Sequence, residues 1–202
     1  MSKLSEFYSS FLNTAREQES NDSEAFRYRF NNALEYRTAR NCRPRTTLML
    51  GSGGKRRLGL VPQAIMSSWP DIDDSLLSYD RYMDVVAFDG EWWEGKCVAR
   101  LVVEIENDMR EFKGTVSDLL RYQALLKVAV FFDSEAVLKK KQLQDQTMAV
   151  FNHFDQHGFC EAADTEYLLV FGPTELVSPG IGEWCAMRFT HGTTEDVSWL
   201  RS

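Results

Sequence analysis

The sequence predicts an α/β protein in which helices flank a central mixed β-sheet. The alternation of two kinds of segment predicts this class. Short runs of apolar and β-branched residues, typical of buried strands, alternate along the chain with segments whose apolar residues recur at helical spacing. The chain has 202 residues, 44% of them hydrophobic and 26% charged, as is ordinary for a soluble globular protein. We therefore expect a single domain over residues 1–202 that buries a substantial core.

Two helices are expected ahead of the sheet. The first runs from Lys3 to about Gln18. The apolar residues that recur in it at helical spacing are Leu4, Phe7, Tyr8, Phe11, Leu12 and Ala15. The second begins near Ser23, an N-cap candidate, and extends to about Asn41. Both helices precede the first expected strand.

A localised basic stretch stands out against the net charge of −7. Residues 36–70 contain no Asp or Glu, and their two expected strands, over residues 46–50 and 58–65, enclose a glycine-rich basic loop. Such charge asymmetry is what a patch facing nucleic-acid phosphates would require. The residues assigned to this contact are Arg43, Arg45, Lys55, Arg56 and Arg57. The alternative is a solvated basic face that pairs with the protein's own acids or with an acidic protein partner.

The central stretch, residues 84–133, carries the residues whose pattern indicates chemistry. Asp84 leads directly into a short apolar strand, and a second strand over residues 96–107 ends in Glu104 and Glu106. Because successive strand side chains point to opposite faces, these two glutamates are expected to share one face. The opposite face is expected to be wholly apolar and to consist of Cys97, Ala99, Leu101, Val103 and Ile105.

These acids are costly to fold together unless a cation or solvent compensates their charge. A bound metal ion would supply the compensating positive charge, so the pattern indicates metal binding. Asp84 is the preferred first ligand, because it adjoins a strand that could pair with the strand carrying Glu104. The acids within residues 71–74 lie in a turn-like context and fit helix capping better.

Helices and short apolar strands alternate through the rest of the chain. In order, they are a helix from Glu111 to about Leu126, a buried strand over residues 128–132 that ends at Asp133, a long helix from its N-cap Ser134 to about His157, a strand over residues 167–171, and an edge strand over residues 184–189. His153 and His157 are spaced i, i+4, which can bind zinc on one helical face. The simpler interpretation places His157 at the negative end of the helix dipole.

The chain is expected to be cytoplasmic, with reduced cysteines and no membrane contact. Its first residues lack the basic-then-apolar pattern of a signal peptide. No apolar run approaches the roughly 20 residues that cross a bilayer. Its four cysteines, Cys42, Cys97, Cys160 and Cys185, form no C-x-x-C pair, which favours reduced thiols over a disulfide framework.

The acids of the central stretch resemble the pattern of the PD-(D/E)XK nuclease superfamily, which has the restriction-endonuclease-like fold. That pattern is an Asp on one strand, an (Asp/Glu)-x-Lys triplet on the next, and then a helix and a further strand. Asp84 would be the first acid, and residues 104–106 the triplet, with Glu106 at the lysine position. Some restriction enzymes of the superfamily carry an acid there and remain active. The resemblance covers about residues 20–175, so the N-terminal helix and the C-terminal strand are extensions of that core.

The resemblance implies a divalent-metal-dependent nuclease that cleaves phosphodiester bonds, in DNA more than in RNA, with Mg²⁺ or Mn²⁺ as cofactor. Asp84 and Glu104 would hold the ion through oxygen ligands. Glu106 would ligate the metal or accept a proton from the attacking water. Polar residues of the next helix are secondary candidates, and Lys113 is near enough in sequence to replace the missing lysine. These secondary candidates are Lys113, Arg121, Gln123 and Lys127.

Two other interpretations stay open. The acid in place of the lysine and the overall negative charge favour a catalytically inactive nuclease-like protein, which keeps the fold and binds nucleic acid or a protein partner. The three acids could also be a coincidence in some other α/β domain. The first of these predicts the same core fold as the nuclease does.

Overall fold

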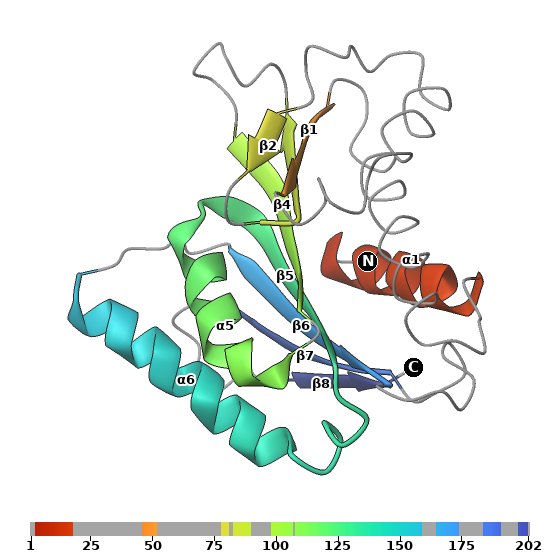
Figure 1. Ribbon diagram of the computed structural model, residues 1–202, viewed down its shortest axis with the longest axis vertical. Helices are drawn as coiled ribbons and strands as arrows, with labels where there is room; N and C mark the ends of the chain where they lie inside the picture. Colours follow the sequence, from red (N-terminus) through yellow and green to blue (C-terminus); the bar gives the residue numbers. More distant parts are fainter. Residues whose placement is uncertain are drawn as a thin grey trace.

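The computed structural model of the chain describes residues 3–17, 46–51, 78–80, 83–89, 98–106, 108–158, 165–173, 184–190 and 198–201. Within these residues the predicted α/β class is confirmed, because a mixed β-sheet carries helices on both faces (Figure 1). No helix in this part of the chain is long and apolar enough to span a lipid bilayer. The second expected helix and the strand expected over residues 58–65 lie outside the described residues.

The sheet has eight strands in the order β2-β1-β3-β4-β5-β6-β7-β8. Its middle strands β4, β5 and β6 are parallel, while β3 and β7 pair antiparallel on either side of them. The strands are β1 (Thr46–Gly51), β2 (Ser78–Asp80), β3 (Val85–Asp89), β4 (Val98–Glu106), β5 (Ala124–Phe132), β6 (Glu166–Gly172), β7 (Cys185–Thr190) and β8 (Ser198–Arg201). Parallel strands buried on both faces are typically near-continuous apolar runs, as β5 is apart from Lys127 and β6 is after Glu166.

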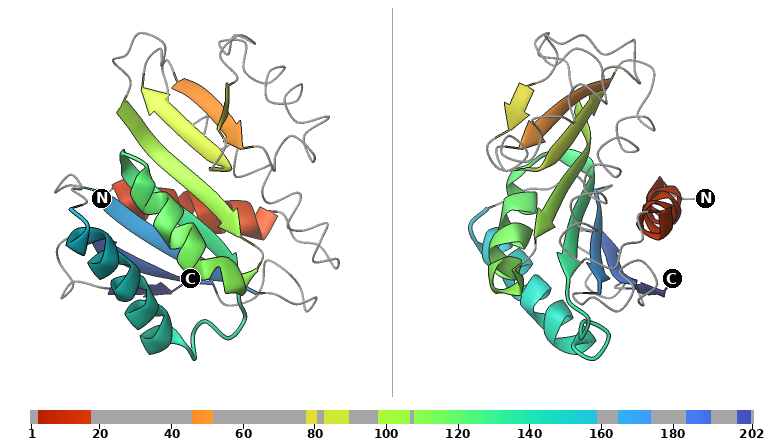
Figure 2. Two further views of the ribbon diagram at one scale, coloured as in Figure 1. Left: turned by 60° about the vertical axis from the view of Figure 1, so that its left-hand side comes forward. Right: turned by 45° about the vertical axis from the view of Figure 1, so that its right-hand side comes forward.

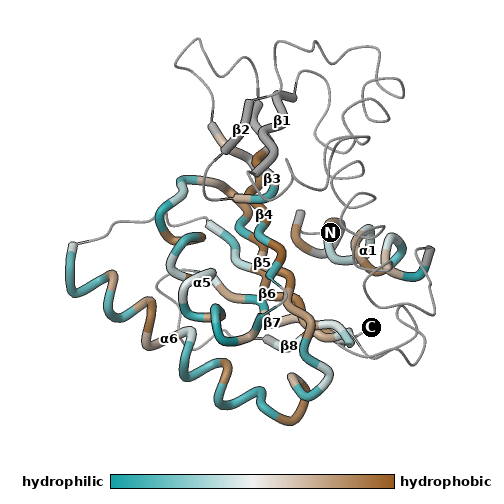
Figure 3. Tube along the Cα trace, in the orientation of Figure 1, coloured by the Kyte–Doolittle hydropathy of each residue, from teal (hydrophilic) through white to brown (hydrophobic). Residues whose placement is uncertain are grey.

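Helices cover the two faces of the sheet unequally. The parallel neighbours need crossover connections, and the helices α5 (Phe112–Arg121) and α6 (Lys140–Gln156) lie in the crossovers from β4 to β5 and from β5 to β6. Both lie on one face, and α1 (Lys3–Glu17) lies on the other (Figure 2). Figure 3 shows the apolar middle strands between these layers and the more polar outer turns of α6.

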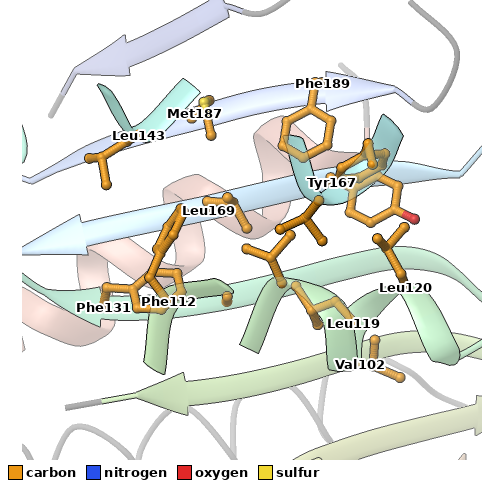
Figure 4. Packing of buried hydrophobic residues seen from close by; sticks show 14 of the residues in the cluster. Val102, Phe112, Leu119, Leu120, Phe131, Leu143, Tyr167, Leu169, Met187 and Phe189 are labelled. Carbon is orange, nitrogen blue, oxygen red and sulfur yellow. The ribbon is translucent and has the colours of Figure 1, made fainter. Parts of the chain in front are cut away.

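Each face of the sheet has its own hydrophobic core. On the α1 side, Leu4, Tyr8 and Phe11 of the helix pack with alternate residues of the middle strands. On the α5 side, the rings of Phe112 and Phe131 pack at a tilt with centroids 5.0 Å apart, within a cluster that extends to Met187 and Phe189 (Figure 4). Alternation along β4 therefore sends successive side chains into different cores.

Four expectations about element boundaries and strand position were wrong. The helix expected to reach Leu126 ends at Arg121, and the strand expected from Val128 begins at Ala124. Residues 124–126 favour helix by intrinsic propensity, but pairing with the neighbouring strands overrides that preference. The long helix begins at Lys140, because residues 134–139 form turns. The strand expected at the edge is internal, because β8 pairs with its outer side.

The expected apolar face of β4 is correct for Leu101, Val103 and Ile105 but wrong for Ala99. Ala99 belongs to the core on the α5 side, whereas the other three belong to the core on the α1 side. The pairing of β3 with β4 shifts register between Ala87 and Phe88, so strict alternation does not extend across this point. Glu104 and Glu106 lie beyond the shift and keep the expected face.

Gly172 at the end of β6 provides a test of how tightly the core is packed. A Cβ atom there would overlap the ring of Trp184, which is itself buried. Because the indole has no space to move into, we expect Gly172→Ala to lower the free energy of unfolding by about 1–3 kcal/mol in urea denaturation.

The matched control is Gly114→Ala in α5. A Cβ atom at this position would lie 3.5 Å from Oε2 of Glu111, an ordinary contact, and alanine favours the helix by about 1 kcal/mol. This variant should be as stable as the parent chain or more so. A Gly172→Ala protein as stable as the parent would contradict the packing described here.

Candidate functional site

Two hydrogen bonds connect Asp84 to Glu104 and to the next residue of β4, Ile105. The backbone N–H of Asp84 donates to Oε2 of Glu104 at 3.0 Å, and the backbone N–H of Ile105 donates to Oδ2 of Asp84 at 2.9 Å. Both carboxylates are half-buried. The structure therefore brings together two acids that lie 20 residues apart in the chain and that the sequence analysis had assigned to one site.

The pairing of β3 with β4 creates this contact. Val85 of β3 lies opposite Val103 of β4, so Asp84, the residue before β3, lies beside Glu104. Glu104 in turn is paired with Ala129 of β5, which faces the α5 side. The two acids thus lie where three strands fix the backbone, on the face that α5 covers.

Burial and like charge make the ionised form of Glu104 costly. Burial contributes most and the negative charge of Asp84 second, and together they raise the pKa of Glu104 to about 9. The hydrogen bond from the Asp84 amide acts in the opposite direction, while the charges of Glu106 and Asp118 add to the increase. Burial and the neighbouring acids therefore favour the protonated form of Glu104 over the ionised form.

Glu106, the third predicted acid, has a different hydrogen-bond partner from Asp84 and Glu104. Its Oε1 accepts a hydrogen bond of 2.7 Å from the backbone N–H of Asp108, in the turn that leads into the 3₁₀ helix η3 (Met109–Glu111). Among the residues that the structure describes, no three Asp, Glu, His or Cys side chains are placed to ligate one ion together. Asp84 and Glu104 therefore form a pair, and Glu106 acts on that pair through its charge.

Asp118 is an acid near the site that the sequence analysis missed. It lies on α5 directly before Leu119, which packs in the same core as Val102 of β4 (Figure 4). Its charge contributes to the raised pKa of Glu104, and its Oδ1 accepts a hydrogen bond of 2.6 Å from Nη1 of Arg121. In the sequence the only signal was its position beside the apolar stripe of this helix.

The secondary candidates lie in different places. Lys113 is exposed on α5 and lines an open surface depression shared with α6, and Gln123 is exposed after the helix. Lys127 is fully buried in β5, and its Nζ donates to Oη of Tyr167 at 3.3 Å. Asp133 follows β5, and its Oδ1 accepts a hydrogen bond from the backbone N–H of Glu135 in the turn before α6.

Two further expectations concern residues away from the carboxylates. The five assigned to phosphate contact, Arg43, Arg45, Lys55, Arg56 and Arg57, lie outside the described residues. His157 contacts the carbonyl oxygen of His153 through Nδ1 at 2.7 Å, and the two rings are 4.4 Å apart. This contact ties His157 to the carbonyl end of α6, as the helix-end interpretation expects.

Comparison of the chain with protein-family models, with curated proteins and with solved structures gives no match in any of the three. The functional argument therefore depends on the geometry of the site and on the chemistry of its residues.

The raised pKa of Glu104 predicts how stability depends on pH. An unfolded glutamate has its pKa near 4.5, so between about pH 4.5 and 9 the folded chain binds a proton that the unfolded chain releases. The contribution of Glu104 to the free energy of unfolding then falls as pH rises through this window. Glu104→Gln keeps an oxygen for the Asp84 amide but cannot ionise, so this contribution disappears.

In metal-free buffer we expect Glu104→Gln to be more stable than the parent chain at pH 8 by on the order of 1–3 kcal/mol, and close to it at pH 5. Urea denaturation across pH measures this difference. Asp145→Asn, at an exposed acid of α6, is the control and should follow the parent curve. Parallel curves for Glu104→Gln and the parent would show that Glu104 is ionised in the folded chain.

Proposed function

We propose that this chain is a divalent-metal-dependent nuclease of the PD-(D/E)XK type that cleaves phosphodiester bonds, with DNA the preferred substrate. Asp84 and Glu104 are its metal-binding carboxylates. One observation carries the proposal: two half-buried acids lie side by side, each accepting a hydrogen bond from a backbone amide of the other segment, although burial and like charge disfavour ionising both. A divalent cation between them would offset this repulsion and replace the proton on Glu104.

The residues present fit Mg²⁺ or Mn²⁺. Carboxylate oxygens are the ligands that these hard cations prefer. Mg²⁺ is usually held by one or two carboxylates and keeps several waters, which leaves positions for substrate phosphates. A two-carboxylate site is therefore consistent with this ion, and a third protein ligand is not required.

The chain's own residues have separate roles in this proposal. The amides of Ile105 and Asp84 orient the two carboxylates before substrate arrives. A bound ion would activate a water and offset the charge of the scissile phosphate. Glu106 lies two residues further along the same face of β4, and we assign it the acceptance of the water's proton.

The order of elements supports the same assignment. An acid before β3 and an acid within β4 are followed by the helix α5 and the strand β5, which is the order of the superfamily pattern. The restriction-endonuclease-like core and the contact of the basic residues 43–57 with the DNA backbone are parts of this proposal. The basic residues would supply the positive charge that an acidic chain needs to approach DNA.

A binding protein without catalytic activity is the second candidate. The observation that favours it is Glu106, which stands where the superfamily has a lysine and whose carboxylate is engaged by the Asp108 amide. Such a protein would keep the nuclease-like core and bind nucleic acid or a protein partner. Metal binding and cleavage distinguish the two candidates.

Cleavage tests the nuclease proposal directly. With Mg²⁺ or Mn²⁺ the parent chain should cut plasmid or linear DNA, and Asp84→Asn and Glu104→Gln should reduce cutting to background, because each removes a charged metal ligand. Gel electrophoresis across both metals and across duplex, single-stranded and RNA substrates provides the measurement. Asp145→Asn is the matched control and should cut like the parent. Full cleavage by both site variants would refute the assignment.

Calorimetry separates the second candidate from the first. Titration with Mn²⁺ should show binding that Glu104→Gln abolishes, because a neutral amide is a poorer ligand than a carboxylate. Metal binding should also raise the melting temperature of the parent chain but not that of the variant. A parent chain that binds no metal and does not cut would leave the binding protein as the function.

A further inference from the structure

We infer that a surface depression between α5 and α6 binds an acidic segment of a partner protein, with one apolar side chain of that segment packed on Leu138. The depression has a volume of about 600 Å³ and is open to solvent. It lies on the two helices that cover the same face of the sheet (Figure 1). Its lining includes Leu138, three lysines and Asp145. The inference goes beyond the proposed function and does not require that the chain cut nucleic acid.

Leu138 is the apolar element of this surface. It is 87% exposed, and the described residues contain no other large hydrophobic residue that is exposed. The turn before α6 fixes its position, because its backbone N–H donates to the carbonyl oxygen of Glu135 at 2.9 Å and the nearby Ala136 is buried in the α5-side core. Leu138 therefore stands at the surface in a defined place, where an apolar side chain of a partner would remove it from water.

The charge of the depression is opposite to that of the whole chain. The chain has a net charge of −7, whereas the depression is lined by Lys113, Lys139 and Lys141 against one carboxylate, that of Asp145. Lys113 belongs to α5, and the other two lysines belong to α6 and its N-cap, so two separate segments supply the positive charge. A surface of this sign complements an acidic segment and repels a basic one.

Two of these lysines keep N–H donors for a partner. Nζ of Lys141 lies 2.8 Å from Oδ1 of Asp145, yet 84% of the Lys141 side chain is exposed. Lys113 is exposed and forms no ion pair with any residue that the structure describes. Because a lysine ammonium has three N–H donors, both lysines can donate to a carboxylate of the partner without releasing a contact within the chain.

An acidic protein segment fits this surface better than a nucleic acid does. A phosphate backbone would contact the lysines, but it offers no apolar group to Leu138 and would be repelled by Asp145. Among the described residues that line the depression there is no arginine, the side chain that matches a phosphate best. A protein segment with acidic residues around one large apolar residue satisfies both the lysines and the leucine.

Selection from a random peptide library tests the inference. The library is displayed on phage and selected on the full parent chain, and the affinity of a selected, labelled peptide is measured by fluorescence anisotropy. We expect the selected peptides to carry Asp and Glu around one large apolar residue. Leu138→Ser should weaken peptide binding several-fold, because it removes the apolar contact. Lys113→Gln should also weaken binding and should reduce its dependence on salt concentration.

Two variants are matched controls. Leu138→Met keeps a large apolar side chain and should bind the peptide like the parent chain. Arg16→Gln changes the net charge as Lys113→Gln does, but at an exposed residue of α1 on the other face of the sheet, and it should leave binding unchanged (Figure 2). Urea denaturation should show both Leu138 variants to be as stable as the parent, because substitutions at an exposed side chain have little effect on folding.

Three results would overturn the inference. The first is a selection that yields no peptide whose binding depends on Leu138. The second is a short DNA duplex whose binding to the parent chain is weakened by both Leu138→Ser and Lys113→Gln, which would identify the depression as a nucleic-acid surface. The third is sedimentation of the parent chain as an oligomer that Leu138→Ser dissociates, which would identify a second copy of the chain as the occupant.

Discussion

The contact between Asp84 and Glu104 is the constraint on which the rest of the site depends. Two carboxylates beside each other repel, and each also loses hydration when it is half-buried. Two backbone amides donate to them, one from each strand, and so offset part of this cost. The hydrogen bonds exist only while β3 and β4 keep their register, so the site and the sheet are stabilised or lost together.

The sheet holds this contact rigidly because β4 is an inner strand. It pairs with β3 on one side and with β5 on the other, and separate hydrophobic cores cover its two faces. A strand fixed on both edges cannot move to separate Glu104 from Asp84. The strain of like charges is therefore retained in the folded chain, where protonation or a bound cation can relieve it.

Much of this arrangement could be predicted from local patterns, and the rest could not. The two-residue period of strands placed Glu104 and Glu106 on one face, and the strand after Asp84 made it a neighbour of Glu104. Asp118 was missed because its nearness to Glu104 depends on how α5 packs against β4, which no spacing encodes. Residues 124–126 were assigned to a helix because strand pairing, and not propensity, determines their conformation. The register shift beside Ala99 likewise arises between strands, outside what one strand's pattern can show.

The acid at Glu106 changes what the site requires from its surroundings. The proposed nuclease pattern would have a lysine at this position of the strand, whereas Glu106 adds a further negative charge that acts on Glu104. Under the proposed function, positive charge would therefore come from a bound ion and from other elements of the chain.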